Sequence, residues 1–346
     1  MIRRPPRSTL SSSSAASDVY KRQINAYVRK KPKTVVFAEG EDERVLRAAQ
    51  AILEETSEQP ILIGRPSVLE QRCERLGLVV RPGRDFEIVN PEDDPRYRDY
   101  WTSYHEKMCR RGITPDLAKA ITRTNTTAIA AVMVHRGEAD NLICGTFGEY
   151  RWHLKYVEQV LGAPDCMPHG ALSMMILEDG PLFIADTHIN TEPTPEQITL
   201  SVLGAARHVQ RFGVKPVIAL CARSQFGNIE GGTGQRAREA LKLLNEMDLD
   251  FQYDGEMNID TALDPVLRDR ILPSNRLSGE ANVLIFAHAD AASGVRNIIK
   301  MRAGGLEVGP ILMGMKNKAH IVTPSITARG LLNMAAIAGT PVTEYG

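Results

Sequence analysis

No stretch of this 346-residue chain contains the roughly 18 consecutive apolar residues that a membrane helix requires. Neither sign of charge predominates, because 42 Lys and Arg residues balance 42 Asp and Glu residues, so no global field favours nucleic acid or an acidic membrane. The five cysteines form no CxxC pair, and the 8 histidines form neither HxxxH nor HExxH. These absences predict a soluble, cytoplasmic protein without disulfides or a metal site, and with neither nucleic acid nor a membrane as partner.

The first 23 residues differ in composition from the rest of the chain. They read MIRRPPRSTLSSSSAASDVYKRQ, rich in Arg and Ser with the single acid Asp18. An organellar transit peptide has such a composition, but the string also resembles translated sequencing-adapter sequence. We expect residues 1–23 to be non-native (adapter-like) or a disordered tail, and the natural chain to enter at about Ile24.

From Thr34 onward, short apolar runs that end in Gly or polar residues alternate with helical patterns. The helix signal is clearest after Thr194, which forms a capping box with Gln197, is followed by Pro195, and precedes a stop at Gly213. Strands are expected at 34–40, 60–64, 86–89, 141–145, 181–187, 216–221, 282–287 and 309–314. This alternation predicts an α/β protein with a parallel sheet, helices on both faces, and ligands beyond the carboxyl ends of the strands.

Two segments could hold phosphate. Gly232 and Gly234 precede a helix, where glycines permit close backbone approach and free N–H groups attract anions; a flexible turn explains them equally well. Arg151 follows the strand NLICG and could clamp a phosphate, although a solvated arginine at a helix start is the commoner case. Neither segment matches the phosphate-loop pattern GxxxxGK[ST] or the dinucleotide pattern GxGxxG.

Polar residues also cluster where the strand PLFIA ends, in the segment DTHIN. Asp186, Thr187 and Asn190 could form the lip of a site, but turn chemistry accounts for Asp and Asn in this position as well. Both interpretations stay open from the residues alone.

The stretch PSITARGLLNMAAIAG at 324–339 has the pattern of a loop that enters a helix, a place where proteins hold anions. Arg329 and Gly330 stand at this entrance. Between Thr327 and Pro341 there is no Ser, Cys, His or carboxylate, and Asn333 and Thr340 are weak reagents. The sequence therefore predicts an anion-binding entrance without a reactive group behind it.

Four segments together resemble the phosphate acetyl/butyryltransferase (phosphotransacetylase) family: VVFAEGEDERVLRAA, FIADTHINTEPTPEQI, SGEANVLIFAHADAASG and GLEVGPILMGMKNKAHIVTPSITARG. The likeness runs from about Lys33 to Ala338. It implies two α/β domains with mostly parallel sheets around a cleft, as in isocitrate dehydrogenase, with coenzyme A bound in the cleft and a homo-oligomer, a dimer or higher. We expect the first domain at 24–163 plus 316–346 and the second at 164–315.

The resemblance also implies which residues should react, and here the chain departs from the family. The family pattern has a serine before the arginine of the closing motif and an aspartate, the base, in the following turns. Those positions are Ala328 and Ala335 in this chain. Arg329, Gly330 and Arg151 match the family's ligand-holding residues, and the loops around Asp186, Ser224 and Gly232 should line the cleft.

The pieces NLICGT, DTHIN, VGPILMGM and LLNMAAIA resemble one branch of the family most closely, the C-terminal part of hybrid NADP-dependent malic enzymes. This resemblance implies a domain that binds acetyl-CoA or a related acyl-CoA and regulates an upstream malic enzyme domain, without a metal or NADP site of its own. An upstream reading frame for a malic enzyme half would favour this hypothesis.

Two alternatives remain. The chain could be an active phosphate acetyl/butyryltransferase with Asp290 or Asp186 as a substitute base, which a native start codon near Ile24 would favour. It could also be a decarboxylating dehydrogenase of the shared fold, but it carries no recognisable NADP fingerprint or metal-binding acid cluster.

Overall fold

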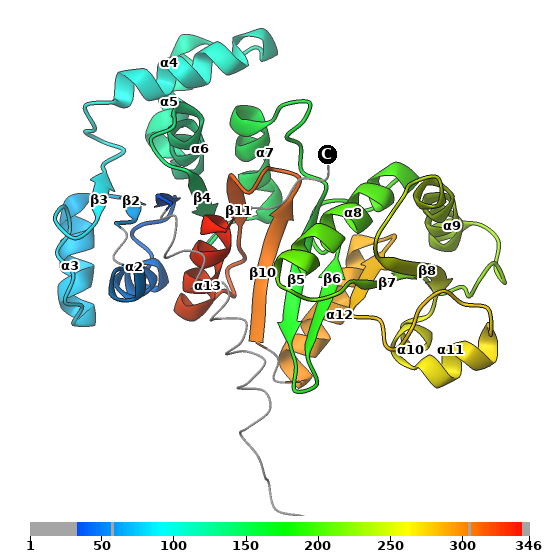
Figure 1. Cartoon of the computed structure of the whole chain (residues 1–346). Helices are drawn as coiled ribbons and strands as arrows, with labels where there is room; N and C mark the ends of the chain where they lie inside the picture. Colours follow the sequence, from blue (N-terminus) through cyan, green and yellow to red (C-terminus); the bar gives the residue numbers. More distant parts are fainter. Residues whose placement is uncertain (1–32, 57–58, 304–305, 341–346) are drawn as a thin grey trace, which may run out of the picture.

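The computed structural model describes residues 33–56, 59–303 and 306–340, so the expected tail at 1–23 lies outside the described residues. Two sheets stand side by side, each between layers of helices (Figure 1). The first is wholly parallel, with the strand order β11–β4–β1–β2–β3. Its strands are β1 (Val35–Phe37), β2 (Ile61–Ile63), β3 (Glu87–Val89), β4 (Asn141–Cys144) and β11 (Ala319–Ile321).

The second sheet has the order β10–β5–β6–β9–β7–β8. Strands β6, β9, β7 and β8 run parallel, whereas β5 and β10 pair antiparallel at one side. The strands are β5 (Gly170–Ile176), β6 (Pro181–Ala185), β7 (Val217–Cys221), β8 (Gln252–Met257), β9 (Val283–Phe286) and β10 (Leu306–Met313). The predicted class, α/β with mostly parallel sheets, is confirmed.

Helices cover both faces of the first sheet because its short strands are apolar on both sides. Val35 and Phe37 face α2 and α13, whereas Val36 faces the layer formed by α4 to α7. Those helices are α2 (Glu43–Thr56), α3 (Pro66–Leu76), α4 (Tyr97–Met108), α5 (Pro115–Thr124), α6 (Thr126–Arg136), α7 (Tyr150–Leu161) and α13 (Ala328–Gly339), with a 3₁₀ turn, η1, at Cys109–Arg111.

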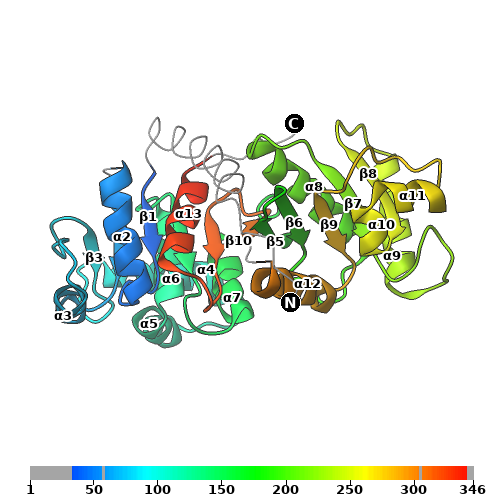
Figure 2. The same ribbon diagram turned by 90° about the horizontal axis from the view of Figure 1, so that it is seen from below.

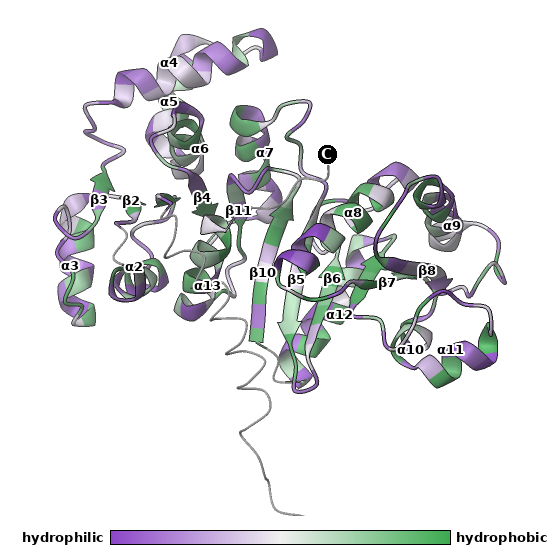
Figure 3. Ribbon diagram, viewed as in Figure 1, coloured by the Kyte–Doolittle hydropathy of each residue, from purple (hydrophilic) through white to green (hydrophobic). Residues whose placement is uncertain are grey.

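The second sheet is covered in the same way. Figure 2 shows α8 on one side of its strands and α12 on the other. The helices are α8 (Pro195–Arg211), α9 (Gly232–Asn245), α10 (Ile259–Leu263), α11 (Pro265–Ile271) and α12 (Ala289–Arg302). The apolar colouring gathers on the strands, as on β4 and β7, and polar colour on outer helix faces (Figure 3). One apolar cluster runs through both sheets, since α13 packs against both α2 and β10.

All eight predicted strands exist, and α8 carries the predicted capping box at Thr194 and Gln197. Strands β5, β8 and β11 were not predicted: β8 reads QYDGEM, half polar at the edge of its sheet, and β11 has three residues. Strand β11 joins the first sheet and α13 packs on α2, while all strands from 170 to 313 belong to the second sheet. The exact domain boundaries stay a prediction.

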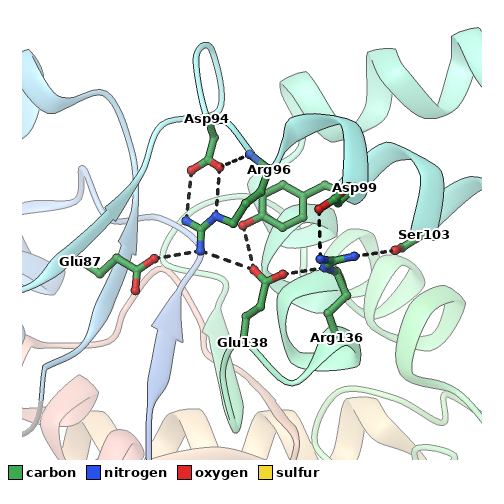
Figure 4. A network of polar contacts seen from close by, with 8 residues as sticks. Glu87, Asp94, Arg96, Asp99, Ser103, Arg136 and Glu138 are labelled. Carbon is green, nitrogen blue, oxygen red and sulfur yellow. Dashed lines mark hydrogen bonds and ion pairs between the residues drawn. The ribbon is translucent and has the colours of Figure 1, made fainter.

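A polar network ties down the segment at 90–96, which leads from β3 to α4 (Figure 4). Arg96 pairs with Asp94 at 3.1 Å, with Glu87 of β3 at 3.0 Å and with Glu138 at 3.5 Å. The Tyr100 hydroxyl donates to Glu138 at 2.9 Å. The network joins β3 and α4 to the turn after α6.

Within the described ranges, no helix is both long and apolar enough to cross a bilayer. In the same part of the chain, no three His, Cys, Asp or Glu side chains gather in a way that could hold a metal ion.

Candidate functional site

A cavity of about 500 Å³ lies at the carboxyl ends of β7, β8 and β9. This is the edge where open α/β sheets bind ligands, and the volume lies within the range of small-molecule sites. The first residues of α9, α10 and α12 adjoin it, so that the positive ends of three helices meet there. Its polar lining includes Arg223, Thr233, Asn258, Asp260 and His288.

Arg223 is the cation of this cavity. Its side chain is exposed and forms no ion pair with any described residue. The backbone beneath it is fixed, because the Asn258 amide, oriented to satisfy its neighbours, donates to the carbonyls of Ala222 at 2.9 Å and Arg223 at 3.1 Å. The cavity therefore presents a free guanidinium on a rigid support. Arg223 was not predicted from the sequence, although a charged residue two positions after a buried strand was the available signal.

The predicted residues Ser224, Gly232 and Gly234 lie together beside this cavity, at the start of α9. Gly232 has a φ of 64°, and nothing lies within 4 Å of a Cβ placed there, so its backbone is open to a ligand. At Gly234, by contrast, a Cβ would collide with the Ser224 hydroxyl. That hydroxyl is buried and has no partner among the described residues. Packing against Ser224 therefore requires a glycine at 234, whereas the absence of a side chain at 232 leaves the backbone there accessible to a ligand.

Asp186 serves the turn after β6. Its Oδ1 accepts from the backbone N–H of Ala171 at 2.9 Å and from those of His188 and Ile189, both at 3.1 Å. Its Oδ2 accepts from the Asn190 backbone at 2.7 Å and side chain at 2.8 Å. Burial raises the pKa of the carboxyl group, and these backbone bonds oppose the increase. Since both oxygens are occupied, turn chemistry accounts for Asp186 and Asn190, and Asp186 is poorly placed to act as a base.

Thr187 lies in the same loop, and Arg151 of α7 contacts this loop. The Thr187 hydroxyl donates to the Ala171 carbonyl at 3.1 Å. Arg151, on the first turn of α7, donates to the Ile189 carbonyl at 2.7 Å and to the Thr191 hydroxyl at 2.8 Å. The loop reaches the cavity, because the Thr191 carbonyl accepts from the N–H of Ala289, next to His288. Arg151 thus positions this loop.

Arg329 and Gly330 lie elsewhere, at the start of α13. Thr327 caps this helix by accepting from the Gly330 N–H at 3.0 Å. The exposed Arg329 side chain pairs with Glu55 of α2 at 3.1 Å. An exposed pair of this kind is worth only about 0–1 kcal/mol, so Arg329 can leave it for a ligand at little cost. Among the described residues, no contact joins Arg329 to Arg151 or to the cavity.

The positions of the family's serine and aspartate hold methyl groups in the structure as well. Ala328 is the first residue of α13 and half-buried, and Ala335 lies about two turns further on, within the apolar core. Asp290, a possible substitute base, is exposed at the start of α12, with its carboxylate 3.9 Å from His288.

Glu39 is a second feature that the sequence analysis missed. It follows β1 and is buried, and its Oε2 accepts from the Gly145 N–H at 3.0 Å. Its Oε1 has no hydrogen bond among the described residues and lies 3.7 Å from His153 Nδ1. Burial raises the pKa of this carboxyl group to about 7. An acid two positions after a buried strand was the signal in the sequence.

Known structures share this arrangement of two sheets. A phosphotransacetylase from Streptococcus pyogenes superposes with a TM-score of 0.84 at 22% identity, covering 93% of this chain and 98% of that one. The protein therefore has a phosphotransacetylase-like fold. Residues 19–339 match the family model for phosphate acetyl/butaryl transferase, and the chain belongs to that family.

The similar curated proteins include malic enzymes and, at lower identity, phosphate acetyltransferases. An NAD-dependent malic enzyme from Rhizobium meliloti is 48% identical over 305 residues, which is 88% of this chain and 40% of that protein. An NADP-dependent malic enzyme from Salmonella typhimurium is 42% identical over 93% of this chain and 43% of its own length. The chain thus spans about two fifths of the length of the malic enzymes that it matches. The resemblance to the malic enzyme branch is confirmed.

Proposed function

We propose that this chain is the acyl-CoA-binding regulatory part of an NADP-dependent malic enzyme, and that it is inactive as an acyltransferase. The observation that carries the proposal is the combination of Ala328 and Ala335 with Arg223, which forms no ion pair within the part of the chain that the structure describes. Arginines that could hold an anion are retained, whereas positions 328 and 335 carry no reactive group. In the parent protein, the upstream half would convert malate to pyruvate and CO₂.

The chemistry of the cavity suits a coenzyme A ligand. Such a ligand carries a diphosphate and a further phosphate, which arginine and helix N-termini bind well. We propose that Arg223 contacts these phosphates together with the open backbone at Gly232, and that Arg329 contributes after it leaves Glu55. The surrounding loops would be shaped by the other predicted site residues, which are Arg151, Asp186, Thr187, Asn190, Ser224, Gly234 and Gly330.

The missing base explains the proposed inactivity. Attack by the CoA thiol on an acyl phosphate needs a group that removes the thiol proton, and loss of a general base costs about 10²- to 10⁴-fold in rate. Asp186 is fully hydrogen-bonded, and Ala328 and Ala335 cannot take a proton. Binding without turnover leaves the free energy of acyl-CoA binding available to bias the upstream half.

Two measurements on the same sample test this proposal. Acetyl-CoA is titrated by calorimetry, and acetyl transfer from acetyl phosphate to CoA is assayed. We expect binding that weakens at least about tenfold in Arg223→Ala and Arg329→Ala, with no transfer. Arg98→Ala, at an exposed position on α4, is the matched control and should bind as the wild type does.

Transfer at the rate of an ordinary acetyltransferase would contradict the proposed inactivity and favour the active-enzyme alternative. Absence of acetyl-CoA binding would contradict the acyl-CoA proposal. If Arg98→Ala weakened binding as much as Arg223→Ala and Arg329→Ala do, the loss of affinity would reflect the net charge of the protein rather than contacts made by Arg223 and Arg329.

A further inference from the structure

The cavity lies where the strand order of the second sheet reverses. Strands β7 and β9 are parallel neighbours, and β8 pairs with β7 on its other side. After β7 the chain enters α9, which shares an apolar cluster with α8, and after β9 it enters α12, which shares another cluster with α10. Figure 2 shows α8 and α12 on opposite sides of the sheet. Between the carboxyl ends of β7 and β9 the chain thus forms the kind of crevice in which open α/β sheets bind nucleotides.

The unit β7–α9–β8 has the connectivity of a mononucleotide-binding half of such a sheet. Three glycines stand at the start of α9, and each meets one requirement of a phosphate-binding turn. Gly231 has a φ of 74° and forms the turn, Gly232 exposes its backbone, and Gly234 lets the helix pack closely on Ser224. Their spacing is shorter than that of GxGxxG, so the sequence pattern alone does not reveal this geometry.

The loop at 222–231 presents both of its ends to the cavity. Its middle is fixed by the buried Glu256, whose Oε1 accepts from the Gly227 N–H at 3.0 Å. Arg223 lines the cavity near one end of the loop, and the first turn of α9 adjoins the cavity at the other. Ser224 is 2% exposed, and its hydroxyl points at this first turn without a partner among the described residues. An unused buried hydroxyl is uncommon, and at a helix N-terminus it favours a ligand with acceptor oxygens.

Asp260 is the second charged group of the cavity, three positions after the end of β8. It is exposed, and its Oδ1 accepts from the Thr261 N–H at 2.8 Å, whereas its Oδ2 forms no hydrogen bond with another described residue. In nucleotide-binding units of this connectivity, an acid that follows the second strand accepts from the ribose 2′-hydroxyl. Within the described ranges no ion pair joins Asp260 to Arg223. The cavity therefore offers a cation and an anion separately, which suits a ligand that carries both phosphates and hydroxyl groups.

We propose that the unit β7–α9–β8 binds a nucleoside 5′-diphosphate. The diphosphate lies over Gly232 and contacts Arg223, and the ribose 2′-hydroxyl donates to Asp260. The base packs against Ile259 and Phe286, which form part of the apolar wall of the cavity. A volume of about 500 Å³ suits a nucleotide and exceeds the needs of a single phosphate. Because acyl-CoA is proposed to use the same arginine, a free nucleotide would compete with it. The nucleotide proposal itself does not require that acyl-CoA binds.

The first test titrates ADP and 2′-deoxy-ADP into the full 346-residue chain by calorimetry. We expect ADP to bind about tenfold more tightly, because 2′-deoxy-ADP lacks the hydroxyl that donates to a carboxylate. Asp260→Ala should weaken ADP binding by a similar factor and make the two ligands bind alike. Asp248→Ala is the matched control, since Asp248 is an exposed acid between α9 and β8, before the amino end of β8. This control should keep the wild-type preference.

Absence of ADP binding at millimolar concentration would overturn the proposal. Equal binding of ADP and 2′-deoxy-ADP by the wild type, or a preference that persists in Asp260→Ala, would overturn the assigned contact with the ribose. Loss of the preference in Asp248→Ala as well would show that it reflects net charge. Far-ultraviolet circular dichroism checks that each variant remains folded.

The second test uses inorganic pyrophosphate, which represents the phosphate half of the ligand alone. Arg223→Ala should weaken pyrophosphate and ADP by the same factor, at least about tenfold, because both place their phosphates at this arginine. Asp260→Ala should not weaken pyrophosphate. Pyrophosphate that binds the wild type as tightly as ADP would overturn the nucleoside part of the proposal.

The third test separates free nucleotide from acyl-CoA, which contains an ADP moiety of its own. Acetyl-CoA is titrated into the chain with and without saturating ADP, and ADP should raise its apparent dissociation constant. Acetyl-CoA binding without ADP binding would overturn the nucleotide proposal and leave the acyl-CoA proposal standing, and ADP binding without acetyl-CoA binding would do the opposite. Independent binding of both ligands, with ADP unaffected by Arg223→Ala, would overturn the placement of the diphosphate at Arg223.

Discussion

The carboxyl ends of the parallel strands differ between the two sheets, although in both sheets helices join these strands. At the first sheet, Arg44 donates to the Thr146 carbonyl at 2.7 Å and to the Ile326 carbonyl at 3.0 Å, and it pairs with Asp42. At the second sheet, the loops after β7, β8 and β9 stand apart around a cavity of about 500 Å³, and Arg223 has no such partners among the described residues. We call the first edge closed, because its arginine is held by the chain's own groups, and the second edge open, because its arginine is available to a ligand.

This difference shows that the order of the strands alone does not decide at which edge a sheet can bind a ligand. The residues after each strand decide it: an arginine that finds carbonyl acceptors fills the edge, and one that finds none leaves a charge for a ligand. Substitutions at the two edges should therefore affect different properties, stability at the first and binding at the second.

The largest effect is expected at the closed edge, from Glu39→Gln. The raised pKa of Glu39 means that the folded protein disfavours the charged form, so stability falls as pH rises from about 4.5 to 7, by up to about 3 kcal/mol. Glutamine cannot ionise, so the variant should lose this slope and become more stable than the wild type near pH 8. Urea unfolding at several pH values measures the difference.

Glu54→Gln, at an exposed position of α2, is the control for Glu39→Gln and should keep the wild-type slope. Parallel pH curves for Glu39→Gln and the wild type would show that Glu39 ionises freely in the folded protein.

The next effect concerns the packing under the open edge. Gly234→Ala drives a methyl group into the Ser224 hydroxyl and should cost about 1–3 kcal/mol. Ser224→Ala removes an unpartnered buried hydroxyl and should by itself be nearly neutral. The double variant should recover part of the loss, which a double-mutant cycle by chemical unfolding measures. Additive losses would mean that the two residues do not compete for the same space.

Arg44 and Arg223 give the most direct comparison of the edges. Arg44→Ala should destabilise the protein by about 1–2 kcal/mol, since it removes charged hydrogen bonds that are only partly exposed to water. Arg223→Ala should change stability by no more than about 0.5 kcal/mol. Thermal unfolding of both variants measures this. Equal losses would mean that Arg223 also supports the fold.

Much of the fold could be predicted because its signals are local. The eight predicted strands are apolar runs bounded by Gly or polar residues, and α8 begins where Thr194, Pro195 and Gln197 indicate. Strand β8 was missed because it is half polar, and its pairing with β7 depends on the sheet rather than on its own sequence.

The candidate site was only partly predictable. Ser224, Gly232 and Gly234 do lie beside the cavity, because residues that follow a parallel strand reach its carboxyl edge. Arg223 was missed although it is adjacent to Ser224, since only the three-dimensional structure shows that no other described residue forms an ion pair with it. Asp186 is of a residue type that occurs in catalytic sites. In the structure, however, its carboxylate accepts hydrogen bonds from backbone N–H groups of the turn that follows it.

By itself, the sequence determined the α/β pattern, the helix caps and the absence of a serine at 328 and an aspartate at 335. Tertiary structure decided the surroundings of the charged groups: Arg44 donates to the carbonyls of residues 146 and 326, and the buried Glu39 lies 3.7 Å from His153. Periodicity and capping act over a few residues and can be recognised in a single segment. The partner of a side chain depends on segments more than a hundred positions away, which only the folded chain brings together.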